Sequence, residues 1–371
     1  MTHSVVKLSL ALTLVGLAST GCPRSADEPQ PTGSQPVEPS KAQPDAKPTE
    51  PAPSKPVATG PIVYFVGSQL WRVEPDGSQA RALGLELANK RTIGVGVSEA
   101  DSAPTVSPDG GWVAWADTID LWIAELGPDG PLRKQITTMP KQQRGRTAAE
   151  IAFSTWSPDS STLVVVLQEP AYGEEDPLPL PDGVQYGSHT LRNGDLTLTH
   201  APHIEGVSGW MPDSKAVIDN KQVAPDSYEL LAYPIDPGPS KLLRKSDDPY
   251  GFAQLQATGE WLAWNASVPG SQIFVAPLGG GERKPMSPQA ADIQWPLVAP
   301  DGAHVIFEWK GKIHVGAGAD ESASKPLPVA EQPRWFDAEH LLAITPEGLV
   351  LLDLDGKSKV LDANGTGLVR Q

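Results

Sequence analysis

The chain has a single cysteine, Cys22, among 371 residues, so no intramolecular disulfide can form. Stability must therefore come from the size of the apolar core and not from covalent cross-links. Basic charge is also scarce, because 29 Lys and Arg residues stand against 45 Asp and Glu residues, a formal net charge of −16. Nucleic acids and anionic membranes are bound through basic faces, so this balance argues against both kinds of binder.

Signatures of common enzyme classes are missing as well. The sequence has no Gly-x-Ser-x-Gly elbow, no phosphate-binding glycine loop and no metal-binding cysteine pair. The segment Gly206-Val207-Ser208-Gly209 is one residue short of the elbow and lies just before Trp210 in a strand context. The acidic spacing of an EF-hand is absent too. These absences favour a protein without catalytic residues or a cofactor.

The N-terminus carries an export signal. Met1–Lys7 is short with one positive charge, Leu8–Ala18 is apolar, and small residues follow up to Cys22. This order matches the three regions of a secretory signal peptide. The apolar run is too short to span a bilayer comfortably.

The cysteine directly after the small residues resembles a bacterial lipoprotein lipobox, although that family usually has Leu where this chain has Ser19. The resemblance implies that residues 1–21 are a lipoprotein signal peptide and that Cys22 is lipidated, which anchors the protein to a membrane. Pro23 stands where Asp retains such lipoproteins at the inner membrane, so the outer membrane, facing the periplasm, is favoured. The alternative is an ordinary signal peptide cleaved near Gly21.

Residues 22–60 form a tether in this interpretation. Pro23–Gly60 is rich in Pro, Ser, Gln, Ala, Lys and Glu and has no aromatic residue. Such a segment cannot bury enough apolar surface to offset its ordering entropy, so we expect it to be disordered. Its prolines make it extended, which would hold a domain at residues 61–371 away from the membrane.

One short turn phrase recurs within that domain. Its copies are Ser107-Pro108-Asp109-Gly110, Ser157-Pro158-Asp159-Ser160, Met211-Pro212-Asp213-Ser214 and Ala299-Pro300-Asp301-Gly302. Pro presets the second position of a type I turn, Asp can bond nearby amides, and Gly is favoured at the fourth position. Each copy is followed by an apolar, strand-like run, and a spaced turn-plus-strand repeat is typical of a β-propeller.

The repeat predicts an all-β fold, a single propeller of four-stranded blades. Six blades have the phrase or its remnant, and an N-terminal set at Ile62–Leu83 lacks an innermost strand. Gly367–Gln371 could supply that strand and close the ring, which removes exposed sheet edges. Seven blades are favoured and six remain open. Trp156, Trp210 and Trp335 end innermost strands, where we expect them to pack between blades; the alternative is an aromatic ligand platform.

This pattern resembles the TolB-type (WD40-like) propeller repeat over residues 61–371. The resemblance implies the fold and says little about activity. TolB itself has an α/β domain before its propeller, whereas here the linker runs directly into strands. That difference weakens any transfer of TolB's partners, the Tol and Pal envelope proteins.

Strand alternation predicts where a binding site would lie. The long connections Gly84–Ser102, Thr138–Glu150 and Glu169–Asn193 belong to adjacent blades and should emerge on the face opposite the turn phrases. Their candidate partner-binding residues are two charged groups and a tyrosine: Lys141, Arg144, Arg146, Glu174, Glu175, Asp176 and Tyr186. These residues suit a protein or peptide partner, or they are simply solvated insertions.

His189, His200 and His203 are the densest group of histidines and the weak candidates for a metal site. The sequence as a whole favours a lipid-anchored envelope propeller that binds a protein or peptide without catalysis. Two alternatives stay open. One is a lyase or hydrolase acting on envelope or extracellular polysaccharide through polar residues in the central channel. The other is a TolB-like component of the Tol-Pal machinery.

Overall fold

The computed structural model describes residues 60–87, 104–117, 120–127, 130–139, 150–169, 179–205, 207–225, 227–246, 253–266, 270–329 and 333–369. The chain divides into two units, Met1–Glu50 and Pro51–Gln371, and every element below belongs to the second. No helix within the described residues is both long and apolar enough to cross a membrane.

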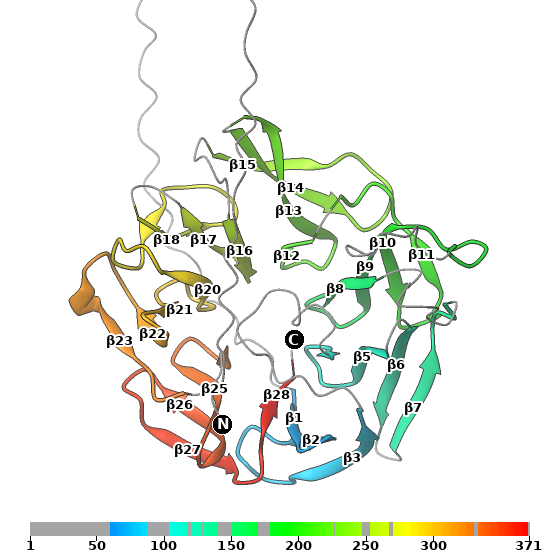
Figure 1. Ribbon diagram of the computed structural model, residues 1–371, viewed down its shortest axis with the longest axis horizontal. Helices are drawn as coiled ribbons and strands as arrows, with labels where there is room; N and C mark the ends of the chain where they lie inside the picture. Colours follow the sequence, from blue (N-terminus) through cyan, green and yellow to red (C-terminus); the bar gives the residue numbers. More distant parts are fainter. Residues whose placement is uncertain are drawn as a thin grey trace, which may run out of the picture. The chain divides into compact units, whose positions relative to one another are not determined.

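Seven four-stranded antiparallel sheets form the blades of a propeller ring (Figure 1). We number the blades 1 to 7 along the chain and name the strands of each from the innermost outward. Blade 1 has β28 (Gly367–Leu368), β1 (Ile62–Val66), β2 (Gln69–Val73) and β3 (Arg81–Glu86); blade 2 has β4 (Thr105–Val106), β5 (Trp112–Asp117), β6 (Asp120–Gly127) and β7 (Gly130–Gln135); blade 3 has β8 (Glu150–Trp156), β9 (Thr162–Gln168), β10 (Gly187–Arg192) and β11 (Leu198–His200).

The other four blades repeat this order. Blade 4 has β12 (Gly209–Trp210), β13 (Ala216–Ala224), β14 (Ser227–Pro234) and β15 (Lys241–Ser246); blade 5 has β16 (Ala253–Thr258), β17 (Trp261–Ala266), β18 (Gln272–Pro277) and β19 (Lys284–Pro285); blade 6 has β20 (Gln294–Val298), β21 (Val305–Trp309), β22 (Lys312–Gly316) and β23 (Ser324–Pro326); blade 7 has β24 (Arg334–Trp335), β25 (His340–Thr345), β26 (Gly348–Asp353) and β27 (Ser358–Asp362). A 3-10 turn, η1 (Glu321–Ala323), precedes β23.

The two ends of the domain close the ring together. The C-terminal β28 pairs with β1, with Leu368 opposite Tyr64 and Gly367 opposite Phe65. In Figure 1 the red β28 lies beside the blue β1. The prediction that the C-terminal segment completes blade 1 is confirmed, and the number of blades is seven, not six.

Each blade buries both faces of its inner strands because it lies between two neighbours. In β9, Leu163, Val165 and Leu167 pack against residues of blade 2, whereas Val164 belongs to the cluster shared with blade 4. Successive side chains of a strand point to opposite faces. A strand covered on both faces is therefore a continuous apolar run, as β9 is in this sequence.

The three tryptophans at the ends of innermost strands pack between blades, as predicted. Trp156 is 3% exposed, and its indole Nε1 donates to the carbonyl oxygen of Thr105 in blade 2 at 3.4 Å. Trp335 Nε1 donates to the carbonyl oxygen of Leu297 in blade 6 at 2.9 Å. Trp210 lies in the apolar cluster that includes Val164 of blade 3. These rings are buried, so the alternative of a ligand platform does not apply to them.

The turn phrases join each innermost strand to the next. In all four copies the amide of the fourth residue donates to the carbonyl of the first, at 2.8–3.0 Å. The Asp side chain then accepts the amide two residues on, as in the bond from Gly111 N–H to Asp109 Oδ1 at 2.9 Å. The fourth residue has a left-handed backbone, with φ between 61° and 70°. Glycine adopts this conformation without strain, and Ser160 and Ser214 adopt it at some cost.

Two predicted loop boundaries were wrong. Gly187–Arg192 is the third strand of blade 3, whereas the sequence analysis placed it inside the loop Glu169–Asn193. Its Ser, His and Thr side chains are small or polar, yet Ser188–Leu191 are all buried. Likewise Gly84, the predicted start of a loop, lies within β3. The connections are therefore 87–104, 136–149 and 169–186.

Candidate binding face

Antiparallel pairing of successive strands sorts the connections onto two sides of the ring. We call the side with the four turn phrases the turn face and the opposite side the loop face. Because direction alternates within every blade, the connections 87–104, 136–149 and 169–186 all emerge on the loop face. They follow one another around blades 1, 2 and 3. The predicted grouping of the long connections on one side of one face agrees with this topology.

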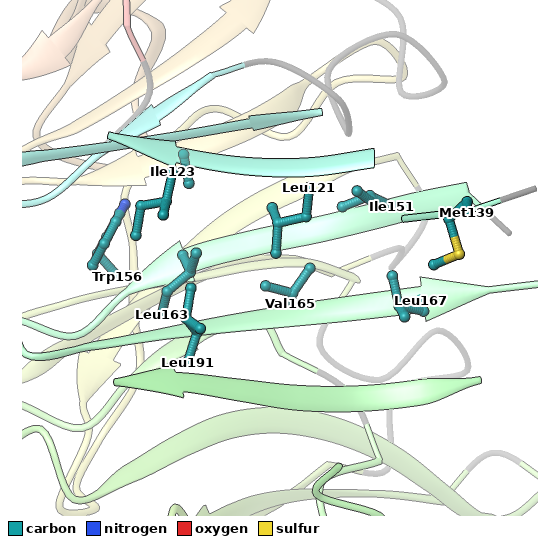
Figure 2. Close-up of a cluster of buried hydrophobic side chains, with 10 residues drawn as sticks. Leu121, Ile123, Met139, Ile151, Trp156, Leu163, Val165, Leu167 and Leu191 are labelled. Carbon is teal, nitrogen blue, oxygen red and sulfur yellow. The ribbon is translucent and has the colours of Figure 1, made fainter. Parts of the chain in front are cut away.

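Two of these connections are rooted in the same apolar cluster, which lies between blades 2 and 3. Its buried members include Leu121 of blade 2, Leu167 of blade 3 and Met139 from the connection 136–149. Leu180 and Val184, from the connection 169–186, pack against the same cluster. Figure 2 shows Met139 at one end of this cluster, near Ile151 and Leu167, and Trp156 at the other. The two connections therefore leave the ring from one shared base.

The Asp120 carboxylate fixes the start of the connection 136–149. Its Oδ1 accepts the Met139 amide at 2.7 Å and its Oδ2 accepts Gln135 Nε2 at 2.9 Å. Thr137 Oγ1 in turn accepts the Leu121 amide at 2.8 Å. A carboxylate acceptor strengthens such bonds relative to neutral ones. The base of this connection is held by polar bonds as well as by the burial of Met139.

Aromatic side chains lie at the loop-face end of blade 2. Trp115 and Trp122 are opposite each other on β5 and β6, and their rings stack with centroids 6.2 Å apart. Trp115 packs partly against the cluster between blades 1 and 2, and both rings keep some exposure. Such a pair offers apolar area together with two indole N–H donors. This pair was not predicted from the sequence, although two tryptophans symmetric about one hairpin were the signal.

Among the predicted binding residues, only Tyr186 lies in the described part of the chain. It ends the connection 169–186 and is 36% exposed. Burial and the nearby charge of Glu169 raise the pKa of Tyr186, so the two ends of this connection lie close together. Lys141, Arg144, Arg146, Glu174, Glu175 and Asp176 lie outside the described residues, as does Cys22.

The histidines divide into a pair and a single residue. His189 and His200 are opposite each other on β10 and β11, with ring centroids 5.0 Å apart. His189 Nδ1 donates to the Gly187 carbonyl at 3.0 Å, and burial lowers the pKa of His189. His203 Nε2 instead donates to the Pro234 carbonyl at 2.8 Å. Within the described residues, no group of three or more His, Cys, Asp or Glu side chains could hold a metal ion.

A polar cluster that the sequence analysis did not identify lies at the blade 4 inner strands. Ser208 Oγ donates to Asp219 Oδ1 at 2.8 Å, and burial raises the pKa of Asp219. The Tyr233 hydroxyl is buried, and burial together with the charges of Glu205 and Asp219 raises the pKa of Tyr233 to about 12. Buried groups with shifted pKa values are candidates for function. From the sequence, Ser208 was noted only as part of Gly206-Val207-Ser208-Gly209, which is one residue short of the Gly-x-Ser-x-Gly elbow of hydrolases.

No known protein family and no curated protein matches this sequence. Among solved structures, a prolyl endopeptidase has 13% identity and a TM-score of 0.51, over 82% of this chain and 49% of that one. TolB from Acinetobacter baumannii has 14% identity and a TM-score of 0.43, over 82% and 64%. Dipeptidyl peptidase 4 from Porphyromonas gingivalis has 12% identity and a TM-score of 0.45, over 80% and 48%. This chain thus spans between about half and two thirds of those proteins. Likeness at such identities shows the fold alone, that of a seven-bladed β-propeller.

Proposed function

We propose that this protein is an exported, lipid-anchored propeller that binds a protein or peptide of the cell envelope through the loop face of blades 1–3, without catalysis. The observation that carries the proposal is the shared base of the connections 136–149 and 169–186. Binding residues are commonly carried on loops that a rigid scaffold positions, and these two long connections start from one place on such a scaffold. Trp115, Trp122 and Tyr186 supply the aromatic area that is enriched at protein interfaces.

The test is capture of the partner from detergent-solubilised envelopes. In one variant, residues 171–178 are replaced by a Gly-Ser linker of equal length; in another, Lys141, Arg144 and Arg146 become alanine. We expect both to lose the proteins captured by the wild type while the thermal midpoint stays the same. Leu132→Ser is the matched control, because Leu132 is an exposed apolar residue on the outer strand of blade 2. An unchanged set of captured proteins in both variants would show that the loop face is not the binding surface.

The anchor is tested separately. Lipidation adds about 0.8 kcal/mol of membrane affinity per buried methylene, so several acyl chains hold a protein firmly. The intact mass of membrane-extracted protein should exceed that of residues 22–371 by the mass of the acyl groups. Cys22→Ser should move the protein to the soluble fraction. A mass equal to that of the unmodified chain would instead support the ordinary signal peptide.

One observation favours the enzyme alternative, the cluster of Ser208, Asp219 and Tyr233. A partly buried carboxyl group with a raised pKa, bonded to a hydroxyl, is an arrangement used in acid–base chemistry. A lyase or hydrolase acting on envelope or extracellular polysaccharide would lose activity in Asp219→Asn with its fold intact, whereas a binding module would capture the same proteins. Co-purification with a Pal-type lipoprotein would instead favour a role in the Tol-Pal machinery.

A further inference from the structure

Equivalent positions on the innermost strands of six blades form a ring of residues around the axis of the propeller. Each residue lies on or near the turn-face end of an innermost strand. In the chain it comes directly before the last residue that precedes the turn, or close to that place. The members of this inner ring are Thr105, Thr155, Gly209, Gln256, Leu297 and Arg334, and each is paired with the second strand of its blade. Blade 1 contributes the apolar stretch Gly367–Val369. Arg334 is the one charged residue of this inner ring.

Arg334 faces blade 1. Its cross-strand partner, Leu342, packs with Ile62 and Tyr64 of that blade. The next residue, Trp335, faces the other way and bonds to Leu297 of blade 6. Figure 1 shows β28 of blade 1 between β25 and β1. Because Arg334 pairs with Leu342 of β25, which packs against blade 1, Arg334 lies where the ring closes.

The guanidinium group of Arg334 has no partner. Part of the residue remains accessible, but Nε, Nη1 and Nη2 are each buried and none makes a hydrogen bond. Two other arginines of the described chain are paired with carboxylates: Arg192 with Asp236 at 2.6 Å, and Arg72 with Glu74 at 3.0 Å. The protein carries a formal net charge of −16, yet no carboxylate of the described residues lies against this cation.

The charge remains on Arg334 despite its burial. Desolvation lowers the pKa of Arg334 to about 10, so the group is still protonated at neutral pH. A buried cation without a counter-charge costs stability, and buried charges in proteins are ordinarily paired. An apolar side chain at this position would avoid that cost, as Leu297 does at the equivalent position of blade 6. The position therefore calls for an anion from outside the described residues.

We propose that Arg334 anchors an anion site at the turn-face end of the inner ring, which binds an oxyanion group, either a carboxylate or a phosphate. The planar guanidinium offers parallel N–H donors that match both groups in a bidentate manner. Its cross-strand partner Leu342 offers no competing side-chain acceptor, and the apolar cluster to which Leu342 belongs keeps the local dielectric low.

The test is thermal unfolding of the full-length protein at constant pH and ionic strength, with chloride replaced stepwise by inorganic phosphate in one series and by acetate in another. We expect a saturable rise of the midpoint in the wild type that is absent in Arg334→Met. Arg192→Met is the matched control, since it removes an exposed, paired arginine, and it should respond like the wild type. A response to phosphate alone assigns a phosphoryl ligand, and a response to acetate alone a carboxylate. Equal midpoints in all three salts, or a response that survives in Arg334→Met, would overturn the proposal.

A second comparison keeps the test decisive if Arg334→Met folds poorly. Arg334→Lys keeps the positive charge and loses the two parallel N–H donors of the guanidinium. It should therefore bind the anion that stabilises the wild type, phosphate or acetate, at least about tenfold more weakly. In chloride alone, Arg334→Met should be at least as stable as the wild type, because it replaces an uncompensated buried charge with an apolar chain. A less stable Arg334→Met in chloride would mean that the protein itself already compensates the guanidinium, and the anion site would be refuted.

Discussion

On the turn face, neighbouring blades meet through short, repeated contacts. The Asp109 amide donates to Ser160 Oγ of the next blade at 3.0 Å, and the Asp159 amide donates to Ser214 Oγ at the same distance. On the loop face, blades 1–3 carry long connections that follow no repeat, and two of them, 136–149 and 169–186, share a base in the cluster around Met139. The difference is one of role in the ring: repeated contacts hold neighbouring blades together on the turn face, whereas the long connections of the loop face are held at their base.

The first way to test this comparison is to disturb the turn face where its packing is tightest. A Cβ atom on Gly302 would overlap the indole of Trp261 in the preceding blade, and φ is +70° there. We expect Gly302→Ala to lower the free energy of unfolding by about 3 kcal/mol, from overpacking and backbone strain together. Equilibrium denaturation measures the change.

The control for that substitution is Gly130→Ala on the same face. Its φ is also positive, at 106°, but nothing lies within 4 Å of the added Cβ. Strain alone should cost about 1 kcal/mol. Equal losses for the two alanines would show that contact between blades contributes nothing at the turn face.

The regular part of the molecule was predictable from sequence, and its physical basis explains why. Pro, Asp and Gly in fixed order specify one turn through local chemistry, so the phrase at Ser107–Gly110 locates two strands without tertiary information. The closure of the ring by Gly367–Leu368 was also predictable, because a propeller that leaves a sheet edge exposed is disfavoured. The eroded copy at Ala257-Thr258-Gly259 was still identifiable, since the strand after it keeps its apolar run.

Features that depend on neighbouring blades could not be predicted in this way. Gly187–Arg192 looks polar and was assigned to a loop, because its burial comes from the blades on either side and not from its own side chains. Asp120 anchors Met139, nineteen residues away, through contacts that no local pattern specifies. In the sequence, nothing distinguishes Arg334 from an ordinary surface charge. Only the pairing of β24 with β25 shows that it belongs to the inner ring.

A second prediction concerns the loop face and acid. His189 lies in the buried stretch Ser188–Leu191 of β10, just after the connection 169–186, and burial lowers the pKa of His189. Below pH ~6.5 the unfolded chain takes up a proton that the folded chain resists, so stability falls with decreasing pH until the folded histidine also titrates. One such group gives a slope of at most about 1.4 kcal/mol per pH unit.

His189→Gln should therefore flatten the loss of stability between pH ~7 and ~5 in denaturation curves. His203→Gln is the matched control, because it keeps His189 and removes a histidine bonded to the Pro234 carbonyl. It should retain the wild-type slope. A His189→Gln variant as acid-sensitive as the wild type would place the sensitivity elsewhere in the molecule.

The smallest expected effect returns to the turn face and to the fourth residue of the phrase. Ser160 has a strained φ of 63° and accepts the Asp109 amide. Ser160→Ala keeps the strain and loses the bond, for a loss of about 1 kcal/mol in the free energy of unfolding. Ser160→Gly loses the same bond and relieves the strain, so about half that loss is expected from denaturation. Equal losses would mean that the left-handed backbone costs nothing here.

This pair of variants also tests why the fourth residue differs among blades. Where it is serine, in blades 3 and 4, the preceding blade presents an amide to its hydroxyl. Where it is glycine, in blades 2 and 6, the preceding blade presents the rings of Pro61 and Trp261, which leave no room for a Cβ. The neighbour thus determines the residue, and Gly110→Ser should destabilise more than Ser160→Gly because it meets Pro61 and gains no amide. If Gly110→Ser and Ser160→Gly lower the free energy of unfolding equally, local turn chemistry alone determines the choice between glycine and serine. The adjacent blade would then have no influence on that residue.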